Sequence, residues 1–318
     1  MAAQLHVIIG VILLAGAGCD EPQARDGAAA GSVQLARAPA RARVFQPVVA
    51  GQFYPGTAGE IRKLLSRYLE AAQPGKLTGK LVGLVSPHAG YVYSGPVAAY
   101  GYKLLEGRSF ERVVVLAPSH RVYSEKIGTL PHDAYRTPLG ELTIDRKAVD
   151  TLVDKYDFVA VEEKLFSREH ALEVQLPFLQ TVLPGVPLVP LVYGNPDAGL
   201  ARKLARALHE TFPGSDTLVI ASSDLTHFLT YEVARSKDLT TLGHITRNEQ
   251  DKLASKHGAP GPGGRRESLL CGFGPVLTLM ELARLRGATG TQIRYGNSGD
   301  TAGDKSRVVG YGVVVFAK

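Results

Sequence analysis

The sequence has no run of five or more lysines or arginines and no recognisable nucleic-acid-binding module. Its 318 residues have a formal net charge of +6, but four arginines contribute to this excess within one short segment near the start: Arg25, Arg37, Arg41 and Arg43. The rest of the chain is therefore closer to neutral. Basic charge alone is a weak argument for binding DNA or RNA, so we expect no nucleic-acid partner.

Long apolar runs are also missing. The apolar segment Val7–Gly18 is too short to cross a bilayer as a helix, but it has the length of the hydrophobic part of a signal peptide. Small residues precede Cys19, a pattern that resembles the lipobox of bacterial lipoproteins. We therefore expect residues 1–19 to be a signal peptide, with a lipid on Cys19 anchoring an exported protein to the membrane. The alternative is a cytoplasmic protein, because Met1–His6 contains no lysine or arginine.

Cysteine is scarce, since the chain contains only Cys19 and Cys271. Residues 20–43 are rich in Ala, Arg, Gly and Pro, and they have too few large apolar side chains to offset the entropy cost of ordering. We interpret them as a disordered linker before a domain spanning 44–318. If Cys19 bears a lipid, Cys271 is a lone thiol; a disulfide between the two is the alternative.

Short apolar runs alternate with amphipathic stretches from residue 44 onward, which is typical of strands alternating with helices. We predict strands at 81–86, 112–117, 187–193, 217–221, 292–295 and 307–316. We predict helices at 61–72, 97–106, 146–156, 169–183, 198–211, 232–256 and 274–286. The expected fold is a single α/β domain whose mainly parallel or mixed sheet is flanked by helices.

Polar residues that bind metals or transfer protons follow three of these strands: His88, His120, and Asp224 with His227. Ligands of open α/β sheets bind at the carboxyl ends of the strands, so these side chains can converge. Cys271 precedes a predicted helix whose N-terminus favours a thiolate. Two imidazoles and one thiolate can hold a divalent metal and leave a fourth position open. Taken singly, each histidine could be a hydrogen-bonded loop residue, and the cysteine a small buried apolar side chain.

Ordered motifs along most of the chain are similar to those of the Memo family, called AmmeMemoRadiSam system protein B in bacteria. They are Ala50–Pro55, Pro87–Tyr91, Pro118–His120, Glu169–Pro177, Ser222–Asp224 with His227, Cys271–Gly272 with Pro275, Gly299–Asp300, Gly303–Asp304 and Val309–Tyr311. The resemblance implies a fold like that of the class III extradiol dioxygenases. It also allows for protein partners from the AmmeMemoRadiSam system.

The resemblance further implies one metal ion, iron or copper, bound by His88, His120 and Cys271, with Asp224 and His227 as nearby catalytic groups. The related dioxygenases have a glutamate where Cys271 stands. Because thiolate is softer than carboxylate, ring cleavage cannot be transferred to this chain, and zinc is an alternative ion.

Two further motifs have competing interpretations. His170 and Glu173 could lie close behind the metal ligands or contact substrate, or they could have a structural capping role. The Gly299–Asp304 segment matches no calcium-loop pattern, so we predict a turn there.

Three functions compete. The first is a metal-dependent redox enzyme acting on an unknown small molecule, with His227 as general acid or base oriented by Asp224. The second is a non-catalytic metal-handling protein, and the third is a partner-binding protein on an enzyme-like fold.

Overall fold

The structure is a computed structural model, and it describes residues 42–214, 216–258 and 268–318. The expected signal peptide, Cys19 and the expected linker as far as residue 41 lie outside the described residues.

Within those ranges, nine strands form one mixed sheet in the order β10-β12-β2-β9-β3-β8-β4-β7, with β11 paired to β12. The strands are β2 (Leu81–Ser86), β3 (Arg112–Pro118), β4 (Ile127–Thr129), β7 (Val159–Val161), β8 (Leu188–Tyr193), β9 (Thr217–Ser222), β10 (His227–Leu229), β11 (Thr289–Asn297) and β12 (Val308–Ala317). β2, β9, β3 and β8 are parallel neighbours, whereas β12 runs antiparallel to β2. The predicted mixed α/β fold is confirmed.

A smaller sheet of three strands includes the first segment of the domain. In it β1 (Val44–Phe45) pairs in parallel with β5 (Ala134–Thr137), which pairs antiparallel with β6 (Gly140–Thr143).

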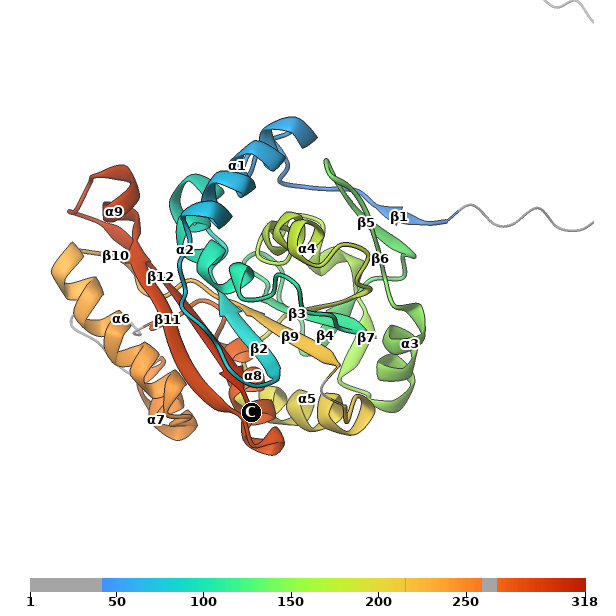
Figure 1. Cartoon of the computed structure of the whole chain (residues 1–318). Coiled ribbons are helices and arrows are strands. Elements are labelled where there is room, and N and C mark those ends of the chain that lie inside the picture. The colour runs from blue at the N-terminus through green and yellow to red at the C-terminus, as the bar shows by residue number, and fades with distance from the viewer. Residues whose placement is uncertain (1–41, 215, 259–267) are drawn as a thin grey trace, which may run out of the picture. The chain divides into compact units, whose positions relative to one another are not determined.

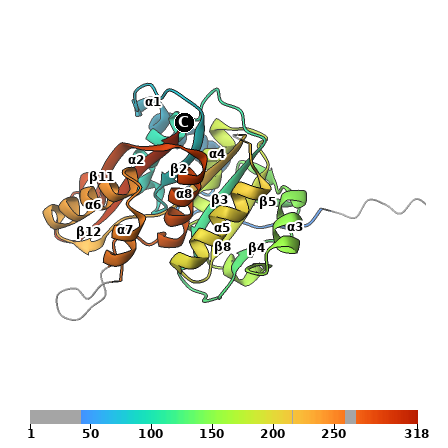
Figure 2. The ribbon, with the colours of Figure 1, turned by 90° about the horizontal axis from the view of Figure 1, so that it is seen from below.

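Helices cover both faces of the large sheet (Figures 1 and 2). They are α1 (Ala58–Ala71), α2 (Tyr91–Lys103), α3 (Arg146–Lys155), α4 (Leu176–Val182), α5 (Ala198–Thr211), α6 (Tyr231–Thr246), α7 (Gln250–Lys256), α8 (Phe273–Arg286) and α9 (Ser298–Ala302). Figure 1 shows α1, α2 and α4 together on one side of the sheet, with α5 and α8 packed against each other on the opposite side. None of the helices in the described ranges is both long and apolar enough to span a membrane.

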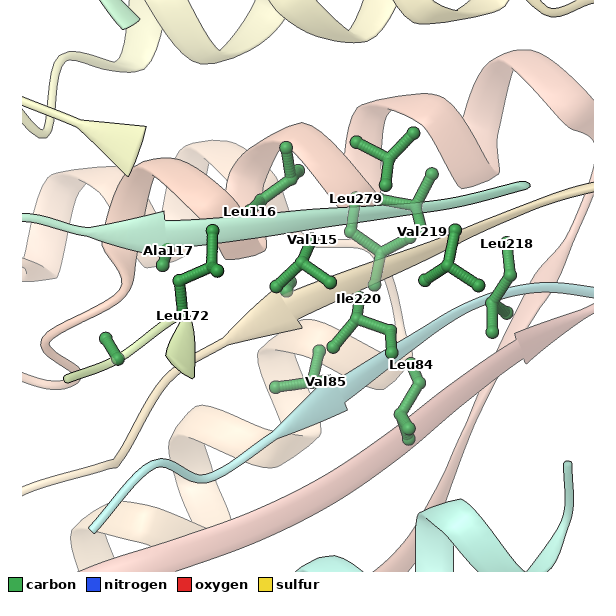
Figure 3. Close-up of a cluster of buried hydrophobic side chains, with 14 of the residues drawn as sticks. Leu84, Val85, Val115, Leu116, Ala117, Leu172, Leu218, Val219, Ile220 and Leu279 are labelled. Atoms are coloured by element: carbon green, nitrogen blue, oxygen red, sulfur yellow. The ribbon is translucent and has the colours of Figure 1, made fainter. Parts of the chain in front are cut away.

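The central strands of the large sheet are apolar along their whole length because both of their faces are buried. All six residues of β2, β8 and β9 are buried, as expected for parallel strands covered on both faces. Figure 3 shows side chains from the three central strands packed with one another and with Leu279 of α8. This packing fixes the central strands side by side, and therefore fixes where each of them ends.

Four expected elements differ from the structure. The predicted helix over 169–183 is wrong: Glu169 to Leu172 is irregular, a single 3₁₀ turn (Glu173–Gln175) follows, and α4 begins only at Leu176. The predicted helix over 232–256 is broken between α6 and α7, where Asn248 has a φ of 55° and its side-chain Nδ2 donates to the Met280 carbonyl. The turn predicted at 299–304 is largely helix α9, because Asn297 and Asp300 form a capping box.

The predicted helix over 97–106 begins six residues earlier, at Tyr91. Proline is unusual in a helix interior, because it lacks the backbone N–H and its ring crowds the preceding turn. In the structure Pro96 lies inside α2.

Candidate metal centre

Three adjacent parallel strands deliver the expected polar residues to one edge of the sheet. His88 follows β2, Asp224 follows β9 and His120 follows β3, and these strands are neighbours in that order. Their carboxyl ends therefore meet, as they do in other open α/β sheets. His227 arrives separately on β10, which pairs with β12 rather than with the central strands.

Cys271 lies at the same edge of the sheet, although it comes from a distant part of the sequence. It lies just before α8, whose N-cap is Gly272. A side chain at Gly272 would place its Cβ only 2.2 Å from the Ser222 carbonyl oxygen, so glycine allows the two segments to approach closely. The Cys271 amide donates to the Asp224 carbonyl at 3.2 Å, and the Asp224 amide donates to the Cys271 sulfur at 3.3 Å.

These placements bring three candidate ligands together. One ligand atom from each of His88, His120 and Cys271 lies within 4.8 Å of the others. His88 is only 1% exposed, whereas the His120 side chain is 31% exposed. The group is therefore closed around His88 and open to solvent beside His120.

Hydrogen bonds fix which nitrogen of His88 can bind a metal. The hydroxyl of Ser222 donates to the Ala171 carbonyl at 2.7 Å, and it accepts from Nε2 of Gln175 at 2.8 Å. The Gln175 amide is oriented by Tyr102, whose hydroxyl donates to Oε1 at 2.6 Å. Ser222 has one proton, so at 2.8 Å it accepts from Nδ1 of His88. Nε2 of His88 is then unprotonated, and it lies 3.0 Å from the Cys271 sulfur.

Glu169 fixes which nitrogen of the His120 ring carries the proton, as Ser222 does for His88. Its carboxylate accepts from the His120 backbone amide at 2.6 Å and from Nδ1 at 2.9 Å. Burial alone would raise the pKa of Glu169, but the hydrogen bonds and charge of His120 outweigh burial and lower it. Nε2 of His120 is therefore unprotonated, and its lone pair is free to bind a metal ion. Sequence reasoning did not single out Glu169; the available signal was an acidic residue beside His170 in a motif shared with the Memo family.

His170 lies behind His120. Its ring stacks on Phe53 at 4.3 Å and on His120 at 4.7 Å between ring centroids. Burial lowers the pKa of His170 to about 4, against the opposing charge of Glu169, so the ring is neutral near pH 7. His170 therefore lies against one candidate ligand, and its role in supporting the site stays a prediction.

A second possible ligand group shares His120 with Glu169 and His170, and its ligand atoms also lie within 4.8 Å of one another. The Glu169 carboxylate already accepts two hydrogen bonds from His120 and one, at 2.8 Å, from the Ala171 amide. Because Nδ1 of His120 donates its proton to Glu169, that nitrogen cannot bind an ion shared with Glu169 and His170, and the group with His88 and Cys271 is the better metal site.

Glu173 has a structural position. Its fully buried carboxylate accepts from the Val48 and Val49 amides at 2.7 and 3.1 Å, and from the hydroxyls of Tyr54 and Tyr135 at 2.7 and 3.0 Å. Four donors satisfy the buried charge. Of the two roles left open for Glu173, the structure favours the structural one, because it fastens the segment containing Phe53 to the domain.

In the described part of the chain no hydrogen bond joins Asp224 to His227, contrary to the sequence-based expectation. Oδ1 of Asp224 accepts from the amides of His88 at 2.7 Å and Ala89 at 3.3 Å. Burial raises the pKa of Asp224 to about 7, although those two hydrogen bonds lower it. Asp224 thus positions His88 and, through its backbone, Cys271. The expectation that it orients His227 is wrong because its carboxylate points to the His88 loop.

His227 is oriented by its own loop. Nδ1 lies 2.9 Å from the Leu225 carbonyl, so it donates there and Nε2 is unprotonated. Burial is the largest influence and lowers the pKa of His227, with a smaller lowering by His120. The charge of a protonated His227 would in turn lower the pKa of His88, which places the two rings in one electrostatic environment.

The cysteine differs from the sequence-based expectation. Burial raises the pKa of the Cys271 thiol, and the nearby Asp224 charge raises it further, while the Asp224 amide acts in the opposite direction. Cys271 lies one residue before the helix cap, so the helix N-terminus does not dominate. The free site therefore holds a thiol, and a cation must displace its proton.

Comparisons with known proteins agree with this architecture. A family model described as Memo-like protein matches residues 45–315. A MEMO1 family protein of Nitrosopumilus maritimus is 32% identical over 86% of this chain and 99% of its own length. Another, from Methanopyrus kandleri, is 36% identical over 86% of this chain and 98% of its own length. An uncharacterized protein of Escherichia coli K12 shares the fold, with a TM-score of 0.51, 15% identity, and coverage of 74% of this chain and 99% of that chain.

The expected signal peptide and lipoprotein are corrected by the same comparisons. The family match begins at residue 45, and the two relatives are covered almost completely by about 86% of this chain. Membership of the family therefore gives no support to a lipid on Cys19, and the lipobox-like pattern was too short and too irregular to establish one.

The family match over residues 45–315 includes the segments that hold His88, His120 and Cys271. The chain belongs to the Memo family.

Proposed function

We propose that the protein binds one redox-active metal ion, iron or copper, through Nε2 of His88, Nε2 of His120 and the sulfur of Cys271. The observation that supports this most directly is the orientation of the two imidazoles. Ser222 and Glu169 each hold an Nδ1 proton, which leaves both Nε2 lone pairs free in a group whose ligand atoms lie within 4.8 Å. Partners of this kind behind a metal-binding histidine commonly fix its tautomer.

The donor set fits a first-row transition metal. Two imidazoles and a thiolate suit copper, iron or zinc, whereas magnesium and calcium prefer oxygen ligands. Three protein ligands also leave a coordination position for a substrate. Iron or copper bound there would supply a redox-active centre beside the solvent-open side of His120.

The remaining residues support a reaction on a small molecule. His227 is neutral near pH 7 because burial lowers its pKa, and its Nδ1 proton is held by the Leu225 carbonyl. Its Nε2 can therefore accept a proton from a substrate and return it. His170 and Phe53 form an aromatic wall beside His120. Asp224 holds the His88 loop and the Cys271 backbone in register.

Metal analysis tests the proposal. The full chain, purified without added metal and then loaded with iron(II), copper(I) or zinc, should retain about one ion per chain after desalting. Cys271→Ala should lose it, because one of three protein ligands is removed. His209→Ala is the matched control, since that histidine lies on α5 and is outside the candidate group. Equal metal content in wild type and Cys271→Ala would refute the site.

A further inference from the structure

Phe228 has an unusual conformation directly beside His227. Its φ is 62°, in the left-handed region, and its side chain is 60% exposed. The register between β10 and β12 shifts here, because His227 pairs with Val309 and Leu229 pairs with Val308. Phe228 is thus an extra residue in a bulge. Bulges of this kind redirect side chains near functional sites.

The choice of phenylalanine at this position costs stability. A left-handed backbone is free for glycine but costs about 1–2 kcal/mol for a residue with a Cβ, and an exposed ring recovers little by burial. Glycine could form the same bulge without that strain. Strained residues of this kind cluster at functional sites. The structure therefore points to a task for the Phe228 ring outside the folded core.

Arg307 indicates which chemical group could bind beside the Phe228 ring. Its guanidinium lies over the Phe228 ring, with Cζ 5.1 Å from the centroid, and the side chain is exposed. Within the described part of the chain, Arg307 forms no hydrogen bond or ion pair, so its N–H groups are available. A guanidinium stacked on an aromatic face is held flat, and its edge matches the two oxygens of a carboxylate.

We propose that Phe228 and Arg307 form a recognition surface for a small planar carboxylate, which is the substrate class of the neighbouring metal site. The ring of Phe228 would contact the planar part of this compound, while Arg307 pairs with its carboxylate. This inference rests on the proposed function for its link to the metal, but the recognition surface itself consists of residues that bind no metal.

Benzoate and its neutral analogue benzamide are suitable probes, with binding followed by NMR chemical shifts in the zinc-loaded full chain. Wild type should bind benzoate at least about tenfold more tightly than benzamide, the ratio expected for a charge-assisted pair. Arg307→Gln should remove this preference. Arg294→Gln is the matched control, because Arg294 stacks on Tyr100 in the same way, with Cζ 4.8 Å from the centroid, on β11.

Phe228→Gly and Phe228→Ala separate strain from recognition, since both remove the ring but only glycine relieves the backbone. Both should weaken benzoate binding about three- to tenfold, the usual worth of an aromatic contact. Phe228→Gly should melt about 2–4 °C above Phe228→Ala. Unchanged benzoate affinity in both variants would overturn the proposal, and so would equal binding of benzoate and benzamide by wild type.

The same experiment distinguishes this inference from the proposed function. If the wild-type chain takes up no zinc, the metal site is refuted, and benzoate must still shift the backbone signals of Phe228 and Arg307 for the recognition surface to survive. If zinc binds normally and benzoate leaves those signals unchanged, the recognition surface is refuted while the metal site stands.

Discussion

The sulfur of Cys271 lies 3.0 Å from Nε2 of His88, although 183 positions separate the two residues in the sequence. Nδ1 of His88 donates to Ser222, so in the free site Nε2 can accept the thiol proton, and the Asp224 carbonyl, 3.6 Å from the sulfur, is a second acceptor. A metal ion bound by the sulfur and Nε2 would displace this proton. Binding should therefore release the proton, as is usual for thiolate sites.

The first prediction separates ligands from a proton carrier. His88→Ala should lose the metal, since it removes one of three protein ligands. His227→Ala should keep it, because Nδ1 of His227 bonds its own loop and its ring is not in the ligand group. Once a substrate is known, His227→Ala should lower the rate about 10²- to 10⁴-fold. Full activity in a metal-replete His227→Ala protein would show that His227 carries no proton in the reaction.

The second prediction concerns Glu169. Glu169→Gln leaves His120 in place but replaces a carboxylate that accepts from both its amide and Nδ1. Metal affinity should fall about 10- to 100-fold, as measured by competition with a chelator. Glu249→Gln is the matched control, because Glu249 accepts from Nδ1 of His244 at 2.6 Å outside the candidate site. An equal effect of the two substitutions would show that Glu169 acts through general stability.

The third prediction follows from Asp238, whose buried carboxylate accepts from the amide and hydroxyl of Thr226 and from the hydroxyl of Tyr295. Burial raises the pKa of Asp238 to about 6, despite those hydrogen bonds. The folded state therefore binds this proton more tightly than the unfolded state. Relative to Asp238→Asn, wild type should be most stable below about pH 4 and should lose up to about 3 kcal/mol as the pH rises to about 6.

Urea unfolding of both proteins at several pH values measures that difference. Asparagine retains an acceptor for Thr226 and can donate to the Tyr295 oxygen, so it tests charge with little change in shape. If the difference in unfolding free energy between the two proteins stays constant from pH 4 to 7, the raised pKa assigned to Asp238 is contradicted.

The fourth prediction tests the close approach behind Cys271. Gly272→Ala would place a Cβ 2.2 Å from the Ser222 carbonyl and 2.6 Å from Cβ of Ser223, so the segment must move. We expect a loss of about 1–3 kcal/mol in the free energy of unfolding, together with weaker metal binding. Gly59→Ala in α1 is the control, because no atom lies within 4 Å of its added Cβ and alanine favours helix. Wild-type melting and metal affinity in Gly272→Ala would contradict this account.

The central strands were predictable because their sequences are continuous apolar runs, and a run of that kind is stable only when both faces of the sheet are covered. β2, β3, β8 and β9 lie within one residue of their predicted positions at either end. Once these strands are parallel neighbours, the residues after them must share an edge. The sequence therefore placed His88, His120 and Asp224 together without any knowledge of side-chain contacts.

The segment from Glu169 to Gln175 shows what the sequence could not decide. Its apolar spacing favours a helix, but tertiary contacts outweigh that local preference: Glu169 bonds His120, Glu173 bonds the Val48 and Val49 amides, and Gln175 bonds Ser222. Those partners lie 47 to 125 positions away in the chain. Helix propensity is a small effect beside the free-energy cost of burying a carboxylate that lacks hydrogen-bond donors.

The amino-acid sequence by itself determined which residues can bind a metal and which strands bring them to one edge. Only the tertiary structure decided how each is protonated and oriented: Asp224 holds His88 rather than His227, and burial keeps Cys271 a thiol until a cation arrives. The physical reason is that burial and long-range hydrogen bonds set these properties, and both arise only when distant segments pack together.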